Sequence, residues 1–165
     1  MSLLKIIKYP NSKLRKKCAF VREETDFYQI LKLIDKMYEV MYFMKGIGLA
    51  APQVGVGLRV VVVDIGDGEP LSMINPSILH SEGEIEMEEM CLSIPFVSGY
   101  VKRANKIGVR YIDVNRQVQE SEFEGLKAVC IQHEIEHLEG KLYIDRLSRL
   151  KRQMIDKKYK KFSID

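Results

Sequence analysis

The chain of 165 residues lacks any stretch that approaches the roughly 20 consecutive apolar residues of a transmembrane helix. Its N-terminal segment, residues 1–8, is too short and too charged to provide the apolar core of a secretory signal. Internal repeats, linkers and low-complexity segments are also missing. We therefore expect one soluble domain over residues 1–165, with enough chain to bury a substantial core.

Cysteine is scarce, with three residues at positions 18, 91 and 130. An odd, widely spaced set argues against a disulfide framework. We expect a reducing, cytoplasmic setting in which thiols stay available as metal ligands. The formal net charge of +3 is small and does not by itself indicate a nucleic-acid partner. We expect neither a DNA partner nor a membrane partner.

Histidine is equally scarce, yet two of the three histidines fall in one short segment, Gln132–His137. On a helix, His133 and His137 share a face and lie about 6 Å apart along the axis, so both imidazoles can bind one metal ion. Glu134 lies next to the first of them and can act on a water at the metal. This H-E-x-x-H arrangement predicts metal-assisted hydrolysis of an acyl bond.

A catalytic metal of this kind needs a third protein ligand and one open position. The candidates are Cys91, Cys130, Glu139 and Asp145. Cys130 lies about 10 Å along the helix axis from His137, too far for both to bind one ion. Glu139 points to another face, and Asp145 would need a sharp return of the chain. Spacing favours Cys91, and a thiolate with two imidazoles suits zinc or ferrous iron.

A glycine-rich segment, residues 46–57, follows an apolar-striped helix predicted over residues 25–44. The segment has two interpretations. It is either a flexible loop or an active-site wall whose backbone contacts a ligand, with Gln53 as a polar group inside it. It lacks the Lys-Ser/Thr of a phosphate-binding loop and the spacing of a dinucleotide fingerprint.

The remaining periodicity predicts strands followed by two helices. Pro76 is expected to close the second strand. The helix that carries the histidines should end at Gly140, and a basic terminal helix should follow. The predicted strands are residues 58–65, 71–75, 100–103, 106–114 and 118–123. The first predicted helix begins near residue 124, and the second spans about residues 146–162.

Three motifs together resemble those of the peptide deformylase family. Gly46–Gln53 matches its glycine motif G-φ-G-φ-A-A-x-Q, where φ is apolar. Glu89–Ser93 matches E-G-C-L-S, and Gln132–His137 matches Q-H-E-x-D-H. The motifs occur in family order, and the likeness covers nearly the whole chain. The chain is most similar to the short bacterial form that ends in a helix.

The resemblance implies an enzyme that removes the formyl group from the N-terminal formyl-methionine of newly made polypeptides and releases formate. It implies an α+β fold, with antiparallel sheets around a central metal-binding helix and further helices at the N- and C-terminal ends. It implies one divalent metal, Fe²⁺ in the cell, which Zn²⁺ or Ni²⁺ replaces in purified protein. A bacterial cytoplasm is the implied setting, and an organellar origin stays open.

The resemblance also assigns roles to individual residues. The implied metal ligands are Cys91, His133 and His137, and the implied catalytic groups are Glu134, Gln53 and the backbone N–H of Leu92. Glu134 would be the general acid and base, and the other two would stabilise the oxyanion. Gly46 and Gly48 would let the peptide lie against the chain. The methionine pocket would comprise Ile47, Leu126, Val129 and Cys130, four residues that also fit an ordinary core.

The chain departs from the family pattern at three positions. Met90 stands where the family has glycine, so it lines, narrows or blocks the substrate pocket, and a positive φ there would strain it. Glu136 replaces aspartate, with a mild effect expected on ligand orientation. Ser98 stands where many bacterial members carry arginine. Arg103 matches a family arginine and is expected to pair with Glu89.

The sequence is therefore compatible with three functions. The first is an active deformylase. The second is a deformylase-like protein that binds metal and peptide but is altered by Met90. The third is an ordinary metallopeptidase, suggested by H-E-x-x-H alone. The basic face of residues 146–162 is either simply solvated or docks on ribosomal RNA near the peptide exit.

Overall fold

The structure, a computed structural model, describes residues 2–162. Along this range, six of the strands follow one another, with helices before and after them. The helices are α1 (Phe27–Phe43), α2 (Gly125–Leu138) and α3 (Arg149–Tyr159), with 3₁₀ helices η1 (Ser12–Arg15), η2 (Ala51–Val54), η3 (Tyr143–Arg146) and η4 (Lys160–Phe162). The strands are β1 (Gly48–Ala50), β2 (Val60–Val63), β3 (Leu71–Glu82), β4 (Ile85–Cys91), β5 (Ile94–Arg103), β6 (Lys106–Ile112) and β7 (Val118–Glu124). No helix within the described range is long and apolar enough to cross a membrane.

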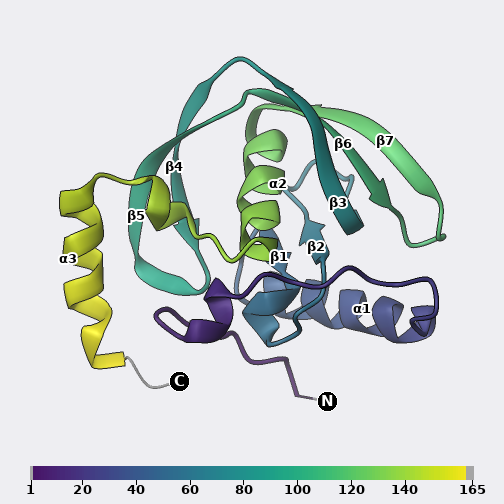
Figure 1. The fold of residues 1–165 in the computed structure, drawn as a ribbon, viewed down its shortest axis with the longest axis horizontal. Helices are drawn as coiled ribbons and strands as arrows, with labels where there is room; N and C mark the ends of the chain where they lie inside the picture. The colour runs from purple at the N-terminus through teal and green to yellow at the C-terminus, as the bar shows by residue number, and fades with distance from the viewer. Residues whose placement is uncertain (1, 163–165) are drawn as a thin grey trace.

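The strands form two antiparallel sheets with α2 between them (Figure 1). One sheet has the order β1-β2-β3-β6-β7, and the other consists of β4 and β5. Helix α1 packs against β1 and β2, whereas α3 stands at the outer edge of the molecule beyond β5 (Figure 1). The predicted α+β fold around a central helix, with an N-terminal and a C-terminal helix, is confirmed.

Strand β2 explains how the core is divided. Its four consecutive valines are all fully buried, because a helix covers each side of the strand. Val61 and Val63 face a cluster that includes Ile131 of α2, while Val60 and Val62 face a cluster that includes Met37 of α1. A strand buried on both faces needs an unbroken apolar run, which is the pattern in the sequence.

Helix α2 is buried along most of its length, polar residues included. It ends as predicted before Gly140, which takes a positive φ of 73°. A Cβ at that position would lie 2.4 Å from the carbonyl oxygen of Arg15. Only glycine can therefore both end the helix and let the chain pass the N-terminal segment.

The prediction that Pro76 closes the second strand is wrong. Strand β3 continues through Pro76 to Glu82 and pairs with β6. The ladder shifts register between Ile74 and Ser77, and Asn75 takes a positive φ of 51° there. Proline is tolerated in a strand at such an irregularity, because no ladder hydrogen bond is required of its missing N–H.

The predicted terminal helix over about residues 146–162 is present, but its predicted start is wrong. Helix α3 begins at Arg149, because the Ser148 side chain caps it by accepting a hydrogen bond from the Lys151 N–H at 3.2 Å. The chain before it forms η3, and residues 160–162 form a 3₁₀ turn. On this helix Ile155 and Tyr159 are buried, whereas Leu150 and Met154 are 69% and 61% exposed.

Candidate active site and metal centre

Two histidines of α2 and the cysteine at the end of β4 converge. The ligand atoms of Cys91, His133 and His137 all lie within 4.8 Å of one another, and all three residues are buried. The Cys91 Sγ is 3.4 Å from His137 Nε2. Distances of this size fit three side chains arranged around one small cation, each at about 2.0 to 2.3 Å from it.

The other candidates for the third ligand are engaged elsewhere. Glu139 pairs with Arg59, and Asp145 pairs with Arg15. Cys130 donates from Sγ to the Ile47 carbonyl at 3.6 Å. Across residues 2–162, the cysteine and two histidines described above form the group with the composition and spacing of a metal site. The preference for Cys91 over these three alternatives is therefore supported by geometry.

A chain of buried charges orients His133. Its Nδ1 lies 2.9 Å from Glu89 Oε1, and Arg103 donates two hydrogen bonds to the same carboxylate at 2.6 and 2.9 Å. Burial alone would raise the pKa of Glu89, but the hydrogen bonds from His133 and Arg103 outweigh it and hold the pKa at about 2. An anionic Glu89 accepts a hydrogen bond from the protonated Nδ1 of His133. The other ring nitrogen, Nε2, is then the one available to a metal.

Glu136 supports the same arrangement from outside. It accepts a hydrogen bond from Arg103 at 2.6 Å and from Arg146 at 3.1 Å. The Arg103 side chain is completely buried, so its two carboxylate partners balance its charge. The predicted pair between Arg103 and Glu89 is present, and the longer Glu136 side chain reaches this pair.

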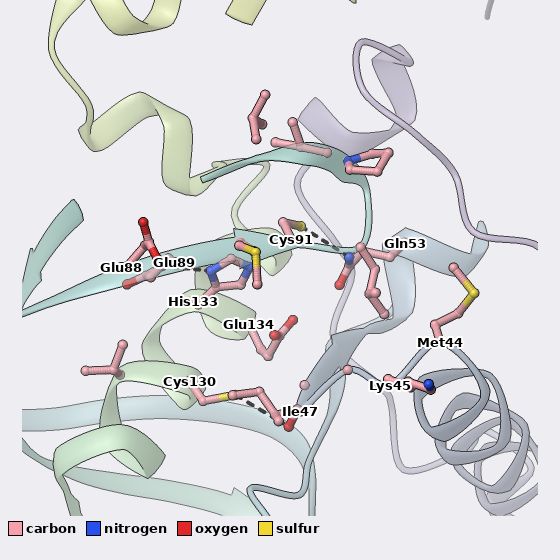
Figure 2. Close-up of a pocket in the computed structure, with 18 of the residues that line it drawn as sticks. Met44, Lys45, Ile47, Gln53, Glu88, Glu89, Cys91, Cys130, His133 and Glu134 are labelled. Carbon is pink, nitrogen blue, oxygen red and sulfur yellow. Dashed lines mark hydrogen bonds and ion pairs between the residues drawn. The ribbon is translucent and has the colours of Figure 1, made fainter. Parts of the chain in front are cut away.

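Glu134 is the buried acid beside the metal ligands. The residue is 3% exposed, and its Oε1 has no hydrogen-bond partner among residues 2–162. Burial raises the pKa of Glu134 to about 7. In Figure 2 its carboxyl group projects from α2 toward the side on which Gln53 lies. A carboxyl with an unpartnered oxygen and a pKa near neutrality can accept and return a proton.

Gln53 lies in η2 with its amide aligned on the site. Its Oε1 accepts a hydrogen bond from the Ala50 N–H at 2.9 Å, which fixes the orientation of the amide. Its Nε2 then donates to Ser93 Oγ at 3.0 Å and approaches Cys91 Sγ at 3.5 Å (Figure 2). The donor end of the amide is therefore directed toward the metal ligands.

A cavity of about 450 Å³ opens beside this cluster. Its size is typical of small-ligand sites. It is lined by the predicted site residues Gly46, Ile47, Gly48, Gln53, Met90, Cys91, Leu92, Leu126, Val129, Cys130, His133 and Glu134. His137 is absent from the lining. Sequence reasoning missed Lys8, Met44, Lys45, Met87, Glu88 and the segment Ile94–Val97. All of them except Lys8 lie close in sequence to the first two motifs, which was the available signal.

Met90 neither strains the backbone nor fills the cavity. It is not among the described non-glycine residues with positive φ, so glycine is not required there by conformation. Its side chain is 73% exposed, which places it at the mouth. Of the alternatives considered for Met90, lining the pocket agrees with the structure.

Comparisons with known proteins agree with this geometry. The family model described as polypeptide deformylase matches residues 3–153. Peptide deformylases of Hydrogenovibrio crunogenus and Alkalilimnicola ehrlichii are each 49% identical over 98% of this chain, and the matches cover 95% and 91% of those proteins. A crystal structure of a Legionella pneumophila peptide deformylase has a TM-score of 0.89 at 43% identity, covering 98% of this chain and 95% of that one. An Ehrlichia chaffeensis peptide deformylase in complex with actinonin has a TM-score of 0.91 at 36% identity, covering 100% of both chains. The chain therefore belongs to the polypeptide deformylase family, whose members remove the N-terminal formyl group from newly made polypeptides.

Proposed function

We propose that this chain, acting as one domain over residues 1–165, removes the formyl group from formyl-methionine polypeptides and releases formate. The observation that carries the proposal is the placement of Glu134, a buried carboxyl with an unpartnered oxygen, beside the Cys91, His133 and His137 group. The metallopeptidase alternative rested on the H-E-x-x-H motif alone, and family membership favours the deformylase.

The ligand set proposed for the metal is one thiolate and two imidazoles. Burial is the main cause, and the charge of nearby His133 the second, of a His137 pKa that lies well below its ordinary value. The low pKa favours the neutral imidazole ring, which is the form that binds metals. We propose Fe²⁺ as the ion in the cell, with Zn²⁺ or Ni²⁺ replacing it in purified protein. When bound, such an ion would polarise a carbonyl oxygen and lower the pKa of a bound water toward neutrality.

Separate groups would then transfer the proton and stabilise the negative charge that develops during the reaction. Glu134 takes a proton from the attacking water and delivers it to the leaving amine nitrogen, so the carboxyl returns to its starting state. Gln53 Nε2 and the backbone N–H of Leu92 donate to the formyl oxygen as negative charge develops on it. One such donor contributes roughly 10²- to 10³-fold to the rate.

The glycine segment is suited to hold the peptide. Strand β1 is the last strand of the five-stranded sheet, so one of its edges is not paired with another strand of the described chain. An extended peptide can add to such an edge through backbone hydrogen bonds. Gly46 and Gly48 line the cavity beside this edge. We assign the backbone of the residues that follow formyl-methionine to this segment.

The methionine side chain would enter the apolar part of the cavity. Ile47 and Leu126 are 42% and 43% exposed, which a binding wall explains better than a core position. Val129 and Cys130 are buried behind them. Burial raises the pKa of the Cys130 thiol well above its ordinary value, so it is a neutral, apolar wall.

The basic helix α3 is assigned to ribosome docking in a bacterial cytoplasm. It stands at the edge of the molecule, and its exposed basic residues include Arg149, Lys151 and Arg152 (Figure 1). Binding to ribosomal RNA through such residues weakens steeply as salt concentration rises. Replacing Lys151 and Arg152 by glutamate should abolish salt-sensitive ribosome binding in sedimentation, and equal binding by the variant would contradict the docking.

The formate-release assay tests the activity directly. Protein prepared anaerobically with Fe²⁺ should release formate from formyl-Met-Ala-Ser, and the Glu134→Ala variant prepared in the same way is the control. Release no faster than that of the variant would refute the proposed function. Cleavage of unformylated peptides by the unsubstituted protein would favour a metallopeptidase instead.

A further inference from the structure

The register between strands β4 and β5 shifts beside the metal site. Glu89 pairs with Gly99, but Cys91, two residues later, pairs with Ile94. Between these pairs β4 has Met90 alone, whereas β5 has the segment Pro95–Ser98. This segment therefore bulges out of the ladder opposite Met90. Bulges next to active sites commonly redirect a side chain.

The bulge and Met90 present two large apolar side chains to solvent at the cavity. Phe96 is 88% exposed and Met90 is 73% exposed, and both line the cavity that contains Cys91 and Glu134. No other large apolar residue in the described chain is as exposed as Phe96. Single exposed apolar residues are common on proteins, but two that lie on paired strands and line one cavity indicate a binding surface.

The exposure of Phe96 does not result from a loose backbone. Three hydrogen bonds from three elements hold the bulge. They are Lys158 Nζ to the Phe96 carbonyl at 3.2 Å, Tyr143 Oη to the Val97 carbonyl at 3.3 Å, and Ser98 Oγ to Glu88 Oε2 at 3.3 Å. Lys158 Nζ also lies 6.0 Å from the centre of the Phe96 ring.

The backbone of Phe96 is in a conformation that aromatic residues rarely adopt. Its φ is +69°, in the left-handed region. Such conformations persist where surrounding contacts enforce them, and they cluster at ligand-binding positions. The backbone that carries the ring is thus fixed before any ligand arrives, which lowers the entropic cost of binding.

We infer that Phe96 and Met90 form an apolar rim that selects formyl-methionine peptides with large apolar side chains at their second and third positions. The inference rests on the proposed function, because it takes the methionine side chain to occupy the inner, apolar part of the cavity. The peptide must then leave across the mouth, where the rim lies. A peptide whose apolar side chains cover the rim removes the apolar surface of Phe96 and Met90 from water, so it binds more tightly. Serine side chains leave this surface exposed to water.

The test compares kcat/KM for formate release from formyl-Met-Leu-Leu and from formyl-Met-Ser-Ser. The unsubstituted protein should prefer the leucine peptide by about ten-fold. Phe96→Ser and Met90→Ser should each lower this ratio, and the double variant should bring it close to one. Tyr28→Ser is the matched control, because Tyr28 is 64% exposed on α1 and does not line the cavity. Its ratio should equal that of the unsubstituted protein.

An unchanged ratio in the double variant would overturn the rim. If no formylated peptide releases formate, the proposed function fails separately. The rim is then judged from the affinities of the deformylated peptides Met-Leu-Leu and Met-Ser-Ser, whose ratio must depend on Phe96 in the same way. A dimer in sedimentation that dissociates in Phe96→Ser, together with an unchanged peptide ratio, would assign the rim to self-association and overturn the inference.

Discussion

Gly48 lies directly against the carboxyl group of Glu134. A Cβ at position 48 would come within 2.5 Å of Glu134 Oε2 and 2.7 Å of Cys130 Sγ. The position of the Glu134 carboxyl group therefore requires glycine at position 48, because any side chain there would displace the group assigned to proton transfer. Gly46 is similarly close to Leu92, with a Cβ contact of 2.9 Å to its Cδ1.

Gly48→Ala should lower kcat/KM for formyl-Met-Ala-Ser by about 10²-fold, because small displacements of catalytic groups are this costly. Gly57→Ala is the matched control, since a Cβ there meets nothing within 4 Å and its φ is not positive. Formate release and thermal unfolding should be measured on both variants. Equal activity of the two would show that Glu134 does not need its present position.

Glu134→Gln should retain the metal but lower kcat by about 10²- to 10⁴-fold, because the amide has the shape of the acid without its proton transfer. The metal content of the purified variant, measured by elemental analysis, separates a lost proton carrier from a lost metal. A variant with full metal content and activity within ten-fold of the unsubstituted protein would remove Glu134 from the mechanism.

Arg103→Met should be strongly destabilising, because it leaves Glu89 and Glu136 without their buried partner. Breaking a buried pair in this way costs about 3–5 kcal/mol in the free energy of unfolding. It should also weaken metal retention by about 10- to 100-fold through the loss of support for Glu89 and His133.

Arg110→Met is the control for this prediction, since the pair of Arg110 with Glu120 is exposed and should contribute at most about 1 kcal/mol. Urea unfolding and competition with a chelator measure the two effects. Similar losses in Arg103→Met and Arg110→Met would contradict the proposed importance of burial.

The ion pair of Arg15 with Asp145 should contribute to the free energy of unfolding at neutral pH and lose this contribution in acid. Burial alone would raise the pKa of Asp145, but the hydrogen bonds from Arg15 and the Leu142 N–H outweigh it, so the pKa is lowered. A carboxyl with a lowered folded-state pKa contributes stability above its unfolded pKa of about 3.9 and loses it as pH falls through the folded-state value. Urea unfolding at pH 7 and pH 3 should therefore show the difference between the unsubstituted protein and Asp145→Asn narrowing at pH 3. A difference that stays constant would assign the effect to packing.

Local patterns determined several features that needed no tertiary information. His133 and His137 share a face because of the helical repeat, and the helix ends before Gly140, because glycine adopts the positive φ at that position without strain. The valine run of β2 predicted a buried strand. Family motifs then predicted twelve of the residues that line the cavity, among them Gln53.

Other features depended on partners distant in sequence. Strand β3 passes through Pro76 because β6 pairs with it on both sides of a register shift, which local propensity cannot reveal. The terminal helix begins late because η3 precedes it and Ser148 caps it.

By itself, the sequence determined the motif that binds and uses a metal, since helical spacing and motif chemistry are local properties. The tertiary structure decided what surrounds that motif, because burial, ion pairs and strand register are set by contacts between distant segments. It brought Cys91 to the two histidines, buried Glu134 so that its pKa rises to about 7, and placed Phe96 on a bulge opposite Met90.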